Sequence, residues 1–289
     1  MCRLIAYAGH SLCVAELVTR PVHSLVNQSY HSTERSEPLN GDGFGVAWYH
    51  PELSERPALF REVTPAWNNE NLRELARVLY SPCILAHIRA APPGSPVYSL
   101  NCHPFVHESL SFMHNGVLAE FKNWRRALLS RLSDQAFHSV RGSTDSEHAF
   151  AVFLDKYRQL DSSVAPPNRM VRAMEMTIAE LEDLKRESSV SDPSYMNFVV
   201  ADGEHIVATR YCTTGAQPAS LHYTTGRQLR CEEGRYKHSG MDSEPEEHDF
   251  VLIASEETTP GFQWETVPPN HLLLTGRNGF VEQREIRAP

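Results

Sequence analysis

The second residue of the chain is a cysteine, and its position gives it chemistry that an internal cysteine lacks. Methionine aminopeptidases accept a small second residue, so we expect Met1 to be removed, leaving a thiol and a free α-amine on Cys2. An α-amine has an unperturbed pKa of roughly 7.7–8.0 and a Cys thiol of about 8.5. The neutral amine can therefore take the thiol proton near physiological pH. The alternative is that Cys2 is an ordinary small residue opening a strand, and its position alone does not decide between the two.

Three other groups of residues have the types needed to cleave a γ-glutamyl amide. Arg89 can bind an α-carboxylate through two hydrogen bonds, and Asp145 can receive an α-ammonium. The Asn115 side chain beside the Gly116 backbone N–H can form an oxyanion hole for a tetrahedral intermediate. Each group also has a structural alternative, respectively a surface arginine, an acid at a helix start and a turn. Sequence spacing alone does not show that they converge.

These residues fall at the ends of expected strands or at the start of an expected helix. Apolar spacing predicts short helical pieces at 12–17 and 22–28 and longer helices at 68–80, 144–157 and 170–186, with another at 121–132. Strands are expected at 2–8, 46–49, 83–90, 110–113, 197–201, 206–211, 219–224, 250–254 and 272–275, whereas 232–249 is expected to be an exposed acidic loop. Because the strands bracket the helices, we expect an α+β fold, with two layers of sheet covered by helices in one domain, 1–289.

Composition excludes several classes of function. The net charge of −9 argues against a nucleic-acid surface or a basic membrane patch, and no apolar run approaches the roughly 20 residues of a spanning helix. Six cysteines without a CxxC pair indicate free thiols in a reducing compartment, so a cytoplasmic location is expected. His103, His107 and His114 cluster in the sequence but lack metal-site spacing. We therefore predict neither a metal nor a cofactor.

Six short motifs occur in an order that is specific to one family. They are Met1-Cys2-Arg3, Asn40-Gly41-Asp42-Gly43-Phe44-Gly45, Ala86-His87-Ile88-Arg89, Asn101-Cys102-His103-Pro104-Phe105, His114-Asn115-Gly116 and Ser143-Thr144-Asp145-Ser146-Glu147. With them, essentially the whole chain resembles the class II glutamine amidotransferases of the N-terminal-nucleophile type. More narrowly, it resembles the amidotransferase-like subunits of fungal Dug glutathione-degradation complexes, through Thr19-Arg20-Pro21, 64–69 and 112–116.

The resemblance implies a fold and a role for each matched residue. The implied fold is a four-layer αββα sandwich with two largely antiparallel sheets between helices. Cys2 would be the nucleophile with its own amine as base, and the remaining roles are oxyanion stabilisation by Asn115 and Gly116, substrate binding by Arg89 and Asp145, and support of the Cys2 amine by Asn40 and Gly41. His87 and His103 are expected to be structural. After Arg89, the better-known relatives have Trp-Ala-Thr-His where this chain has Ala90-Ala91-Pro92-Pro93, which removes a hydroxyl and an imidazole from the substrate site.

The resemblance also implies the reaction, while leaving its substrate open. We expect hydrolysis of a γ-glutamyl amide, in glutathione, a related peptide or glutamine, through a γ-glutamyl thioester, with a peptidase-type protein partner. Three alternatives remain. The chain could be a glutaminase subunit supplying ammonia to a separate synthase, a stand-alone γ-glutamyl hydrolase of a thiol metabolite such as an ergothioneine precursor, or a non-catalytic scaffold. The oligomeric state is not predicted.

Overall fold

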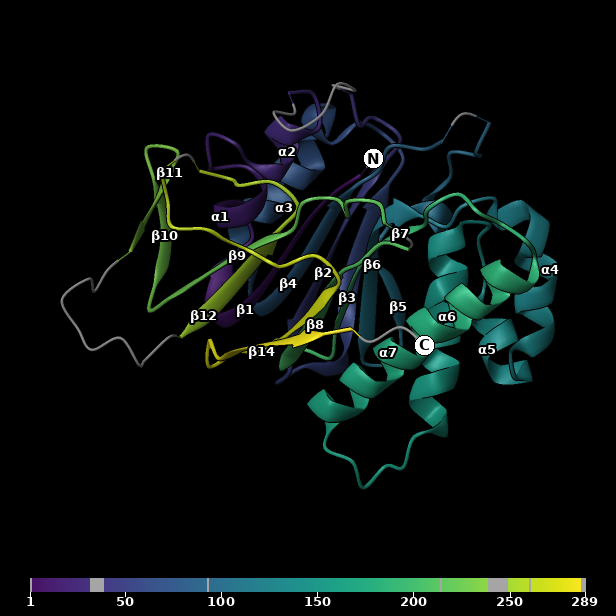
Figure 1. Cartoon of the computed structure of the whole chain (residues 1–289). Helices are drawn as coiled ribbons and strands as arrows, with labels where there is room; N and C mark the ends of the chain where they lie inside the picture. The colour runs from purple at the N-terminus through teal and green to yellow at the C-terminus, as the bar shows by residue number, and fades with distance from the viewer. Residues whose placement is uncertain are drawn as a thin grey trace.

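Two antiparallel β-sheets stacked face to face occupy the centre of the molecule in a computed structural model (Figure 1). The structure describes residues 2–31, 39–92, 94–213, 215–238, 249–259 and 261–286. The first sheet has the order β13 (Glu265–Thr266), β9 (His222–Gly226), β12 (Phe250–Ala254), β1 (Arg3–Cys13), β4 (Tyr80–Ile88), β2 (Phe44–His50) and β3 (Ser54–Glu62). The second has the order β15 (Val281–Glu285), β14 (His271–Gly276), β8 (His205–Arg210), β7 (Tyr195–Ala201), β6 (Leu110–Val117) and β5 (Phe105–His107).

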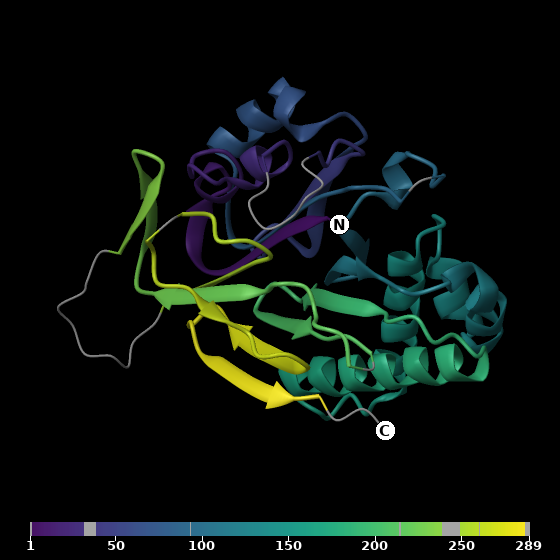
Figure 2. The same ribbon diagram turned by 45° about the horizontal axis from the view of Figure 1, so that its top comes forward.

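Helices cover the outer faces of both sheets (Figure 2). The first sheet is covered by α1 (Ala15–Val18), α2 (Leu25–Gln28) and α3 (Glu70–Val78). The second is covered by α4 (Phe121–Arg131), α6 (Asp145–Gln159) and α7 (Pro166–Glu187), with α5 (Asp134–Ser139) packed beside α6. A separate hairpin, β10 (Leu229–Glu232) and β11 (Arg235–His238), completes the described strands, and two 3₁₀ helices lie at Ala66–Asn68 and Ser99–Asn101. The predicted four-layer αββα arrangement is therefore confirmed.

Strand alternation assigns side chains to these layers. In β1, Leu4 and Ala6 belong to the apolar layer between the two sheets, whereas Ile5 belongs to the layer beneath α1–α3. In β6, Met113 faces the first sheet and Phe112 lies in the core shared with α6 and α7. The same alternation decides which residues at the strand ends can face the space between the sheets.

Capping residues fix the starts of two helices that were expected from the sequence. The Asn69 side chain accepts the Leu72 N–H at the start of α3 (2.8 Å), and the Thr144 hydroxyl accepts the Glu147 N–H at the start of α6 (3.2 Å). The helix expected at 170–186 begins earlier, at Pro166, because proline is tolerated in the first helical turn.

Several sequence predictions of local structure were wrong. β1 does not end at Gly9; it continues to Cys13 past an irregularity between Ala8 and Leu12, and Gly9 permits close approach to Phe250 of β12. The strands β3, β5, β10, β13 and β15 and the helix α5 were not expected from the sequence. Part of the segment expected as a loop at 232–249 forms β11, while 239–248 lies outside the described residues.

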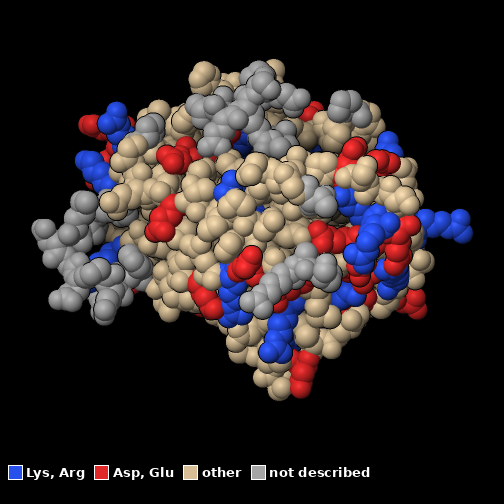
Figure 3. All heavy atoms as spheres, viewed as in Figure 1, with Lys and Arg blue, Asp and Glu red and all other residues tan. Residues whose placement is uncertain are grey.

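On the face of the molecule shown in Figure 3, the described residues form no patch of purely positive or purely negative charge. There, the Lys and Arg side chains of the described residues are interspersed with Asp and Glu. Among the described residues, no helix is both long enough and apolar enough to cross a membrane.

Candidate active site

Cys2 and Arg89 meet at one end of the first sheet. β1 pairs with β4 in antiparallel fashion, with Arg3 opposite Ile88. At this end of the pair, Cys2 precedes Arg3 and Arg89 follows Ile88, so Cys2 and Arg89 lie side by side. The Cys2 Sγ accepts a hydrogen bond from the Ala90 N–H at 3.4 Å. Cys2 shares the parity of Leu4 and Ala6, so its side chain starts on the face directed toward the second sheet. The strand register therefore brings together two sequence-predicted residues that are far apart in the chain.

Gly116 presents its backbone N–H at the edge of β6 that faces away from β7. His114 lies two residues before Gly116, and both of its backbone groups point to this edge. Its N–H donates to His103 Nδ1 (3.3 Å), and its carbonyl accepts from His87 Nε2 (3.2 Å). Backbone groups two residues apart share an edge, so the Gly116 N–H has the same direction as that of His114. Asn115 and Gly116 do not form the turn that was the structural alternative for this dipeptide, since both residues pair with β7.

A side chain at position 116 would collide with the neighbouring strand. A Cβ built there would lie 1.9 Å from the Tyr195 carbonyl oxygen and 2.5 Å from His114 Nε2. The side chain of the neighbouring residue, Asn115, lies on the other face of β6, which is the face of Met113 and is directed toward the first sheet. Asn115 is buried, and its Oδ1 has no hydrogen-bond partner among the described residues.

Asp145 occupies the first position of α6 and holds the chain that follows β6. Its Oδ2 accepts the Leu118 N–H and its Oδ1 accepts the Ser146 N–H, each at 2.8 Å. The Arg89 guanidinium is held by the Asp42 and Pro96 carbonyl oxygens, at 3.5 and 3.3 Å. One cationic and one anionic group are thus fixed by local contacts on different elements.

Four of the predicted residues line one cavity of about 520 Å³, namely Cys2, Arg89, Gly116 and Asp145. This volume is within the range of pockets that bind small molecules. The wall also includes Ala90, Ala91 and Pro92, together with Leu118, Glu120 and Lys122 from the start of α4 and the segment before it. The structure therefore brings together a thiol, a guanidinium, a carboxylate and a backbone N–H, while Asn115 lies beside the cavity lining.

Burial raises the pKa of the Cys2 thiol, and the Ala90 N–H and Arg89 lower it in partial compensation. A thiol of this kind needs a base to form the thiolate. Burial also lowers the pKa of His114 and holds that of His103 well below its usual value, whereas the pKa of His87 is lowered to about 3. These imidazoles are therefore neutral near pH 7.

The three buried histidines connect the elements around the cavity. His114 Nε2 donates to the Tyr195 carbonyl oxygen (2.8 Å), and its Nδ1 lies 2.9 Å from the Ser146 hydroxyl. Together with the bonds from His87 and His103 to the His114 backbone, these contacts join β4, β6, β7 and α6. His114 was not among the site residues expected from the sequence, yet His114 and His103 both line the cavity.

Asn40 and Gly41 lie outside the cavity lining. Asn40 is buried, and its Nδ2 has no hydrogen-bond partner among the described residues. Gly41 lies against Trp67, where a Cβ would come within 2.9 Å of the indole ring. The next residue, Asp42, makes contacts that the sequence analysis missed, because its carboxylate accepts the Ala91 N–H (2.8 Å) and its N–H donates to the Arg89 carbonyl (3.2 Å).

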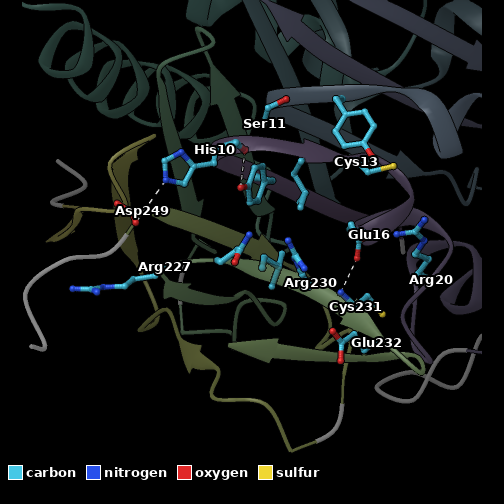
Figure 4. Close-up of a pocket in the computed structure, with 15 residues that line it drawn as sticks. His10, Ser11, Cys13, Glu16, Arg20, Arg227, Arg230, Cys231, Glu232 and Asp249 are labelled. Atoms are coloured by element: carbon cyan, nitrogen blue, oxygen red, sulfur yellow. Dashed lines mark hydrogen bonds and ion pairs between the residues drawn. The ribbon is translucent and has the colours of Figure 1, made fainter. Parts of the chain in front are cut away.

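A second cavity, of about 920 Å³, lies by the far end of β1 (Figure 4). It is lined by groups of both charge signs, including Glu16, Arg20, Arg230 and Glu232, and contains none of the predicted site residues. Contacts between its lining residues include the bond from the Cys231 N–H to Glu16 Oε2 at 2.6 Å and the approach of His10 Nε2 to Asp249 Oδ2 at 3.6 Å. In the described part of the chain, no three His, Cys, Asp or Glu residues are grouped to hold a metal ion.

The stacked sheets and a cysteine at the start of a central strand define an N-terminal-nucleophile amidohydrolase fold. Residues 1–287 match the family model of class II glutamine amidotransferases, and the chain belongs to this family. It is 38% identical over 293 residues to the probable glutamine amidotransferase DUG3 of Saccharomyces cerevisiae, which covers 94% of this chain and 81% of that protein. It is 27% identical over 277 residues to the γ-glutamyl-hercynylcysteine sulfoxide hydrolase of Mycolicibacterium smegmatis, covering 94% of this chain and 95% of that protein.

Solved structures support the same assignment. The glutamine aminotransferase class-II domain protein from Silicibacter pomeroyi matches over 100% of both chains, with a TM-score of 0.66 and 26% identity. The glutamine phosphoribosylpyrophosphate amidotransferase from Bacillus subtilis matches 100% of this chain and 50% of that chain, with a TM-score of 0.61 and 13% identity, which shows the fold alone. The predicted family and fold are confirmed, and so is the prediction that the protein is an enzyme of the γ-glutamyl amide hydrolase and glutamine amidotransferase type.

Proposed function

We propose that the protein hydrolyses the γ-glutamyl amide bond of glutathione or a related γ-glutamyl peptide, with Cys2 as nucleophile. The observation that carries the proposal is that Cys2, Arg89, Gly116 and Asp145 line one cavity. The likeness to DUG3 and to a γ-glutamyl hydrolase supports this class of substrate. The proposal treats 1–289 as a single domain from which Met1, outside the described residues, is removed.

The reaction begins with transfer of the Cys2 thiol proton to the α-amine of the same residue. The thiolate attacks the γ-carbonyl carbon, and the oxyanion that forms is bound by the Gly116 N–H and the Asn115 side-chain amide. When this intermediate collapses, the C–N bond breaks and the leaving amine takes the proton from the Cys2 ammonium. Water then attacks the γ-glutamyl thioester, which releases glutamate and restores the thiol.

Arg89 and Asp145 hold the head group of the substrate in this scheme. The Arg89 guanidinium pairs with the α-carboxylate, and the Asp145 carboxylate pairs with the α-ammonium. Both are already fixed by contacts to backbone groups, which limits the conformational entropy lost on binding. Asn40 and Gly41 are assigned to the support of the Cys2 amine, and the residue that follows them, Asp42, donates its N–H to the Arg89 carbonyl.

The outer part of the cavity suits a leaving group larger than ammonia. Lys122 lines it, and its ammonium forms no hydrogen bond or ion pair with the other described residues. Glutathione and similar γ-glutamyl peptides end in a carboxylate, which Lys122 would attract. The three residues directly after Arg89, namely Ala90, Ala91 and Pro92, line the cavity without a side-chain hydroxyl or imidazole, and the next lining residue of this segment is Ser95.

Glutamate release from glutathione and from glutamine, measured separately, tests the proposal. Wild-type protein, alone or with a co-purified peptidase-type partner, should release glutamate from glutathione. The C2A variant should release none, whereas C231A, which removes another partly buried free thiol, should retain activity. Intact-mass measurement should show that Met1 is absent. Cleavage of glutamine with glutathione untouched in both settings would refute the substrate assignment and favour a glutaminase that supplies ammonia to a synthase.

A stand-alone hydrolase is the second candidate, supported by the likeness to the hercynylcysteine sulfoxide hydrolase over 95% of that protein. Full activity without any partner would favour it. Absence of glutamate release by wild-type protein, or mature protein that retains Met1, would favour a non-catalytic scaffold, whereas a C2A variant as active as wild type would refute Cys2 as the nucleophile. The six free cysteines, which include Cys2, are consistent with a reducing, cytoplasmic compartment.

A further inference from the structure

Residue 2 lies just outside the regular pairing of the first sheet. The ladder between β1 and β4 begins at Arg3, and the ladder between β1 and β12 begins at Ile5. Once Met1 is removed, Cys2 is attached to the chain only through its carbonyl carbon. The torsion angle about the bond between Cα and the carbonyl carbon of Cys2 then sets the directions of both the amine and the thiol.

The side chain of Arg3 fixes this carbonyl. Arg3 Nη1 donates to the Cys2 carbonyl oxygen at 3.0 Å, and Arg3 Nε lies 2.6 Å from Glu256 Oε1. Both side chains are nearly inaccessible to solvent, at 1% and 3%. Arg3 and Glu256 each lie two residues beyond the Ile5–Ala254 pair that ends this ladder, so extending its register places them opposite each other, in agreement with their contact. The intervening pair is also bonded, since the Leu4 N–H donates to the Ser255 hydroxyl at 3.1 Å.

Burying an ion pair carries a desolvation penalty that its mutual attraction often fails to repay. A pair of apolar residues would anchor β1 to β12 without that penalty. A guanidinium can do what an apolar residue cannot, because its donors diverge and can bind a carboxylate and a carbonyl at the same time. A lysine has the charge but not this rigid fork.

We propose that Arg3, anchored by Glu256, is a positioning residue that sets the orientation of the Cys2 amine and thiol through the Cys2 carbonyl. The inference deepens the proposed function and rests on it for the role of Cys2. Arg3 starts from the opposite face of β1 to Cys2 and is not among the residues that line the cavity. It acts on the reaction only through the backbone of residue 2, so substrate binding by Arg89 and Asp145 should not depend on it.

Three variants of the full chain test the inference. R3K removes the fork, E256Q removes the anchoring charge while keeping a side chain of similar shape, and R210K is the matched control. Arg210 is a partly buried arginine that donates to the Ala219 and Val267 carbonyl oxygens (2.9 and 2.7 Å) away from the cavity. Each variant is compared by thermal unfolding, by kcat and KM for glutathione, and by the rate of Cys2 alkylation with iodoacetamide.

Because misplacement of a reacting group by about 1 Å can cost 10²-fold in rate, R3K should lower kcat by roughly 10- to 100-fold. Its KM should stay within about threefold of wild type and its Cys2 alkylation should change in parallel with kcat. E256Q should show a smaller loss, because Arg3 keeps its bond to the Cys2 carbonyl. R210K should change the unfolding temperature without changing kcat.

Folded R3K with wild-type kcat and wild-type alkylation would overturn the inference, as would a loss of kcat in R210K equal to that in R3K. Failure of the proposed function has a different signature, since wild type would then release no glutamate and C2A would match it. Alkylation of Cys2 needs no turnover, so a slower rate in R3K would still support the inference in that case, and an unchanged rate would still overturn it.

Discussion

Substitution of Gly116 by alanine should separate the oxyanion role of this residue from the packing of its strand. The added Cβ would lie 1.9 Å from the Tyr195 carbonyl oxygen and 2.7 Å from its carbonyl carbon. These are backbone atoms of the paired strand, so no rotation of a side chain can relieve the contact. An ordinary carbon–oxygen contact requires over 3 Å, and the strands must therefore separate by roughly 1 Å at this point.

Two losses follow from that displacement. Overpacking of this kind typically costs about 1–3 kcal/mol of stability. The Gly116 N–H would move by a similar distance from the oxyanion, and removal of one oxyanion-hole donor costs roughly 10²–10³ in kcat. We therefore expect G116A to unfold a few degrees below wild type and to lose at least 100-fold in kcat, with a much smaller change in KM.

Gly9 provides the matched control. A Cβ at this position of β1 would lie 2.5 Å from Phe250 Cβ and 2.8 Å from the Asp249 carbonyl oxygen, in the strand paired with it. Gly9 is remote from the cavity that Cys2 lines. G9A should therefore lose stability by a comparable mechanism while keeping kcat near that of wild type.

The assay is glutamate release at saturating glutathione, normalised to the folded fraction from thermal unfolding. Wild-type kcat in folded G116A would refute the assignment of the Gly116 N–H to the oxyanion. An equal loss of kcat in G9A would show that general loosening of the sheets, and not the position of one donor, lowers the rate.

Three further predictions concern other parts of the cavity and its support. D145N should lower kcat/KM by roughly 10- to 100-fold, mainly through KM, because it removes a charge-assisted bond to the α-ammonium; unchanged kinetics would refute this role. K122A should raise KM for glutathione but not for glutamine, and equal effects on both would exclude contact with the leaving group. The pKa of His87 is lowered to about 3 in the folded protein, so the unfolded chain takes up a proton first as the pH falls below about 6.5. Stability should fall between pH 6.5 and 3, by about 2 kcal/mol at pH 5 from His87 alone, and unfolding curves that do not change with pH would contradict this.

Sequence reasoning located the strand ends that carry the site but not their relation in space. The run ending at Arg89 was recognisable because apolar residues are followed by Pro92, which breaks the strand. The contact between Cys2 and Ala90 spans 88 residues of sequence and depends on the register of β1 against β4. No local pattern encodes that register, so the family resemblance supplied what residue spacing could not.

Local rules failed where tertiary pairing overrode them. Asn115-Gly116 has the composition of a hairpin turn, yet β7 pairs with β6 through both residues. β3 was missed because it contains Pro57 and mostly polar side chains, which is typical of an edge strand. In both cases the local signal is real, and the neighbouring strand determines the structure.

The register of β1 also explains why the position of the cysteine in the chain matters so much. Side chains alternate between the two faces of a strand, and a shift of one residue exchanges the faces. Cys2 shares the inner face with Leu4 and Ala6, whereas Arg3 shares the outer face with Ile5. A thiol one position later would begin beneath α1–α3, on the opposite side of the sheet from the Gly116 N–H. The proposed mechanism therefore needs two properties at residue 2: a free amine, which removal of Met1 would supply, and a position along β1 that directs the thiol toward the second sheet.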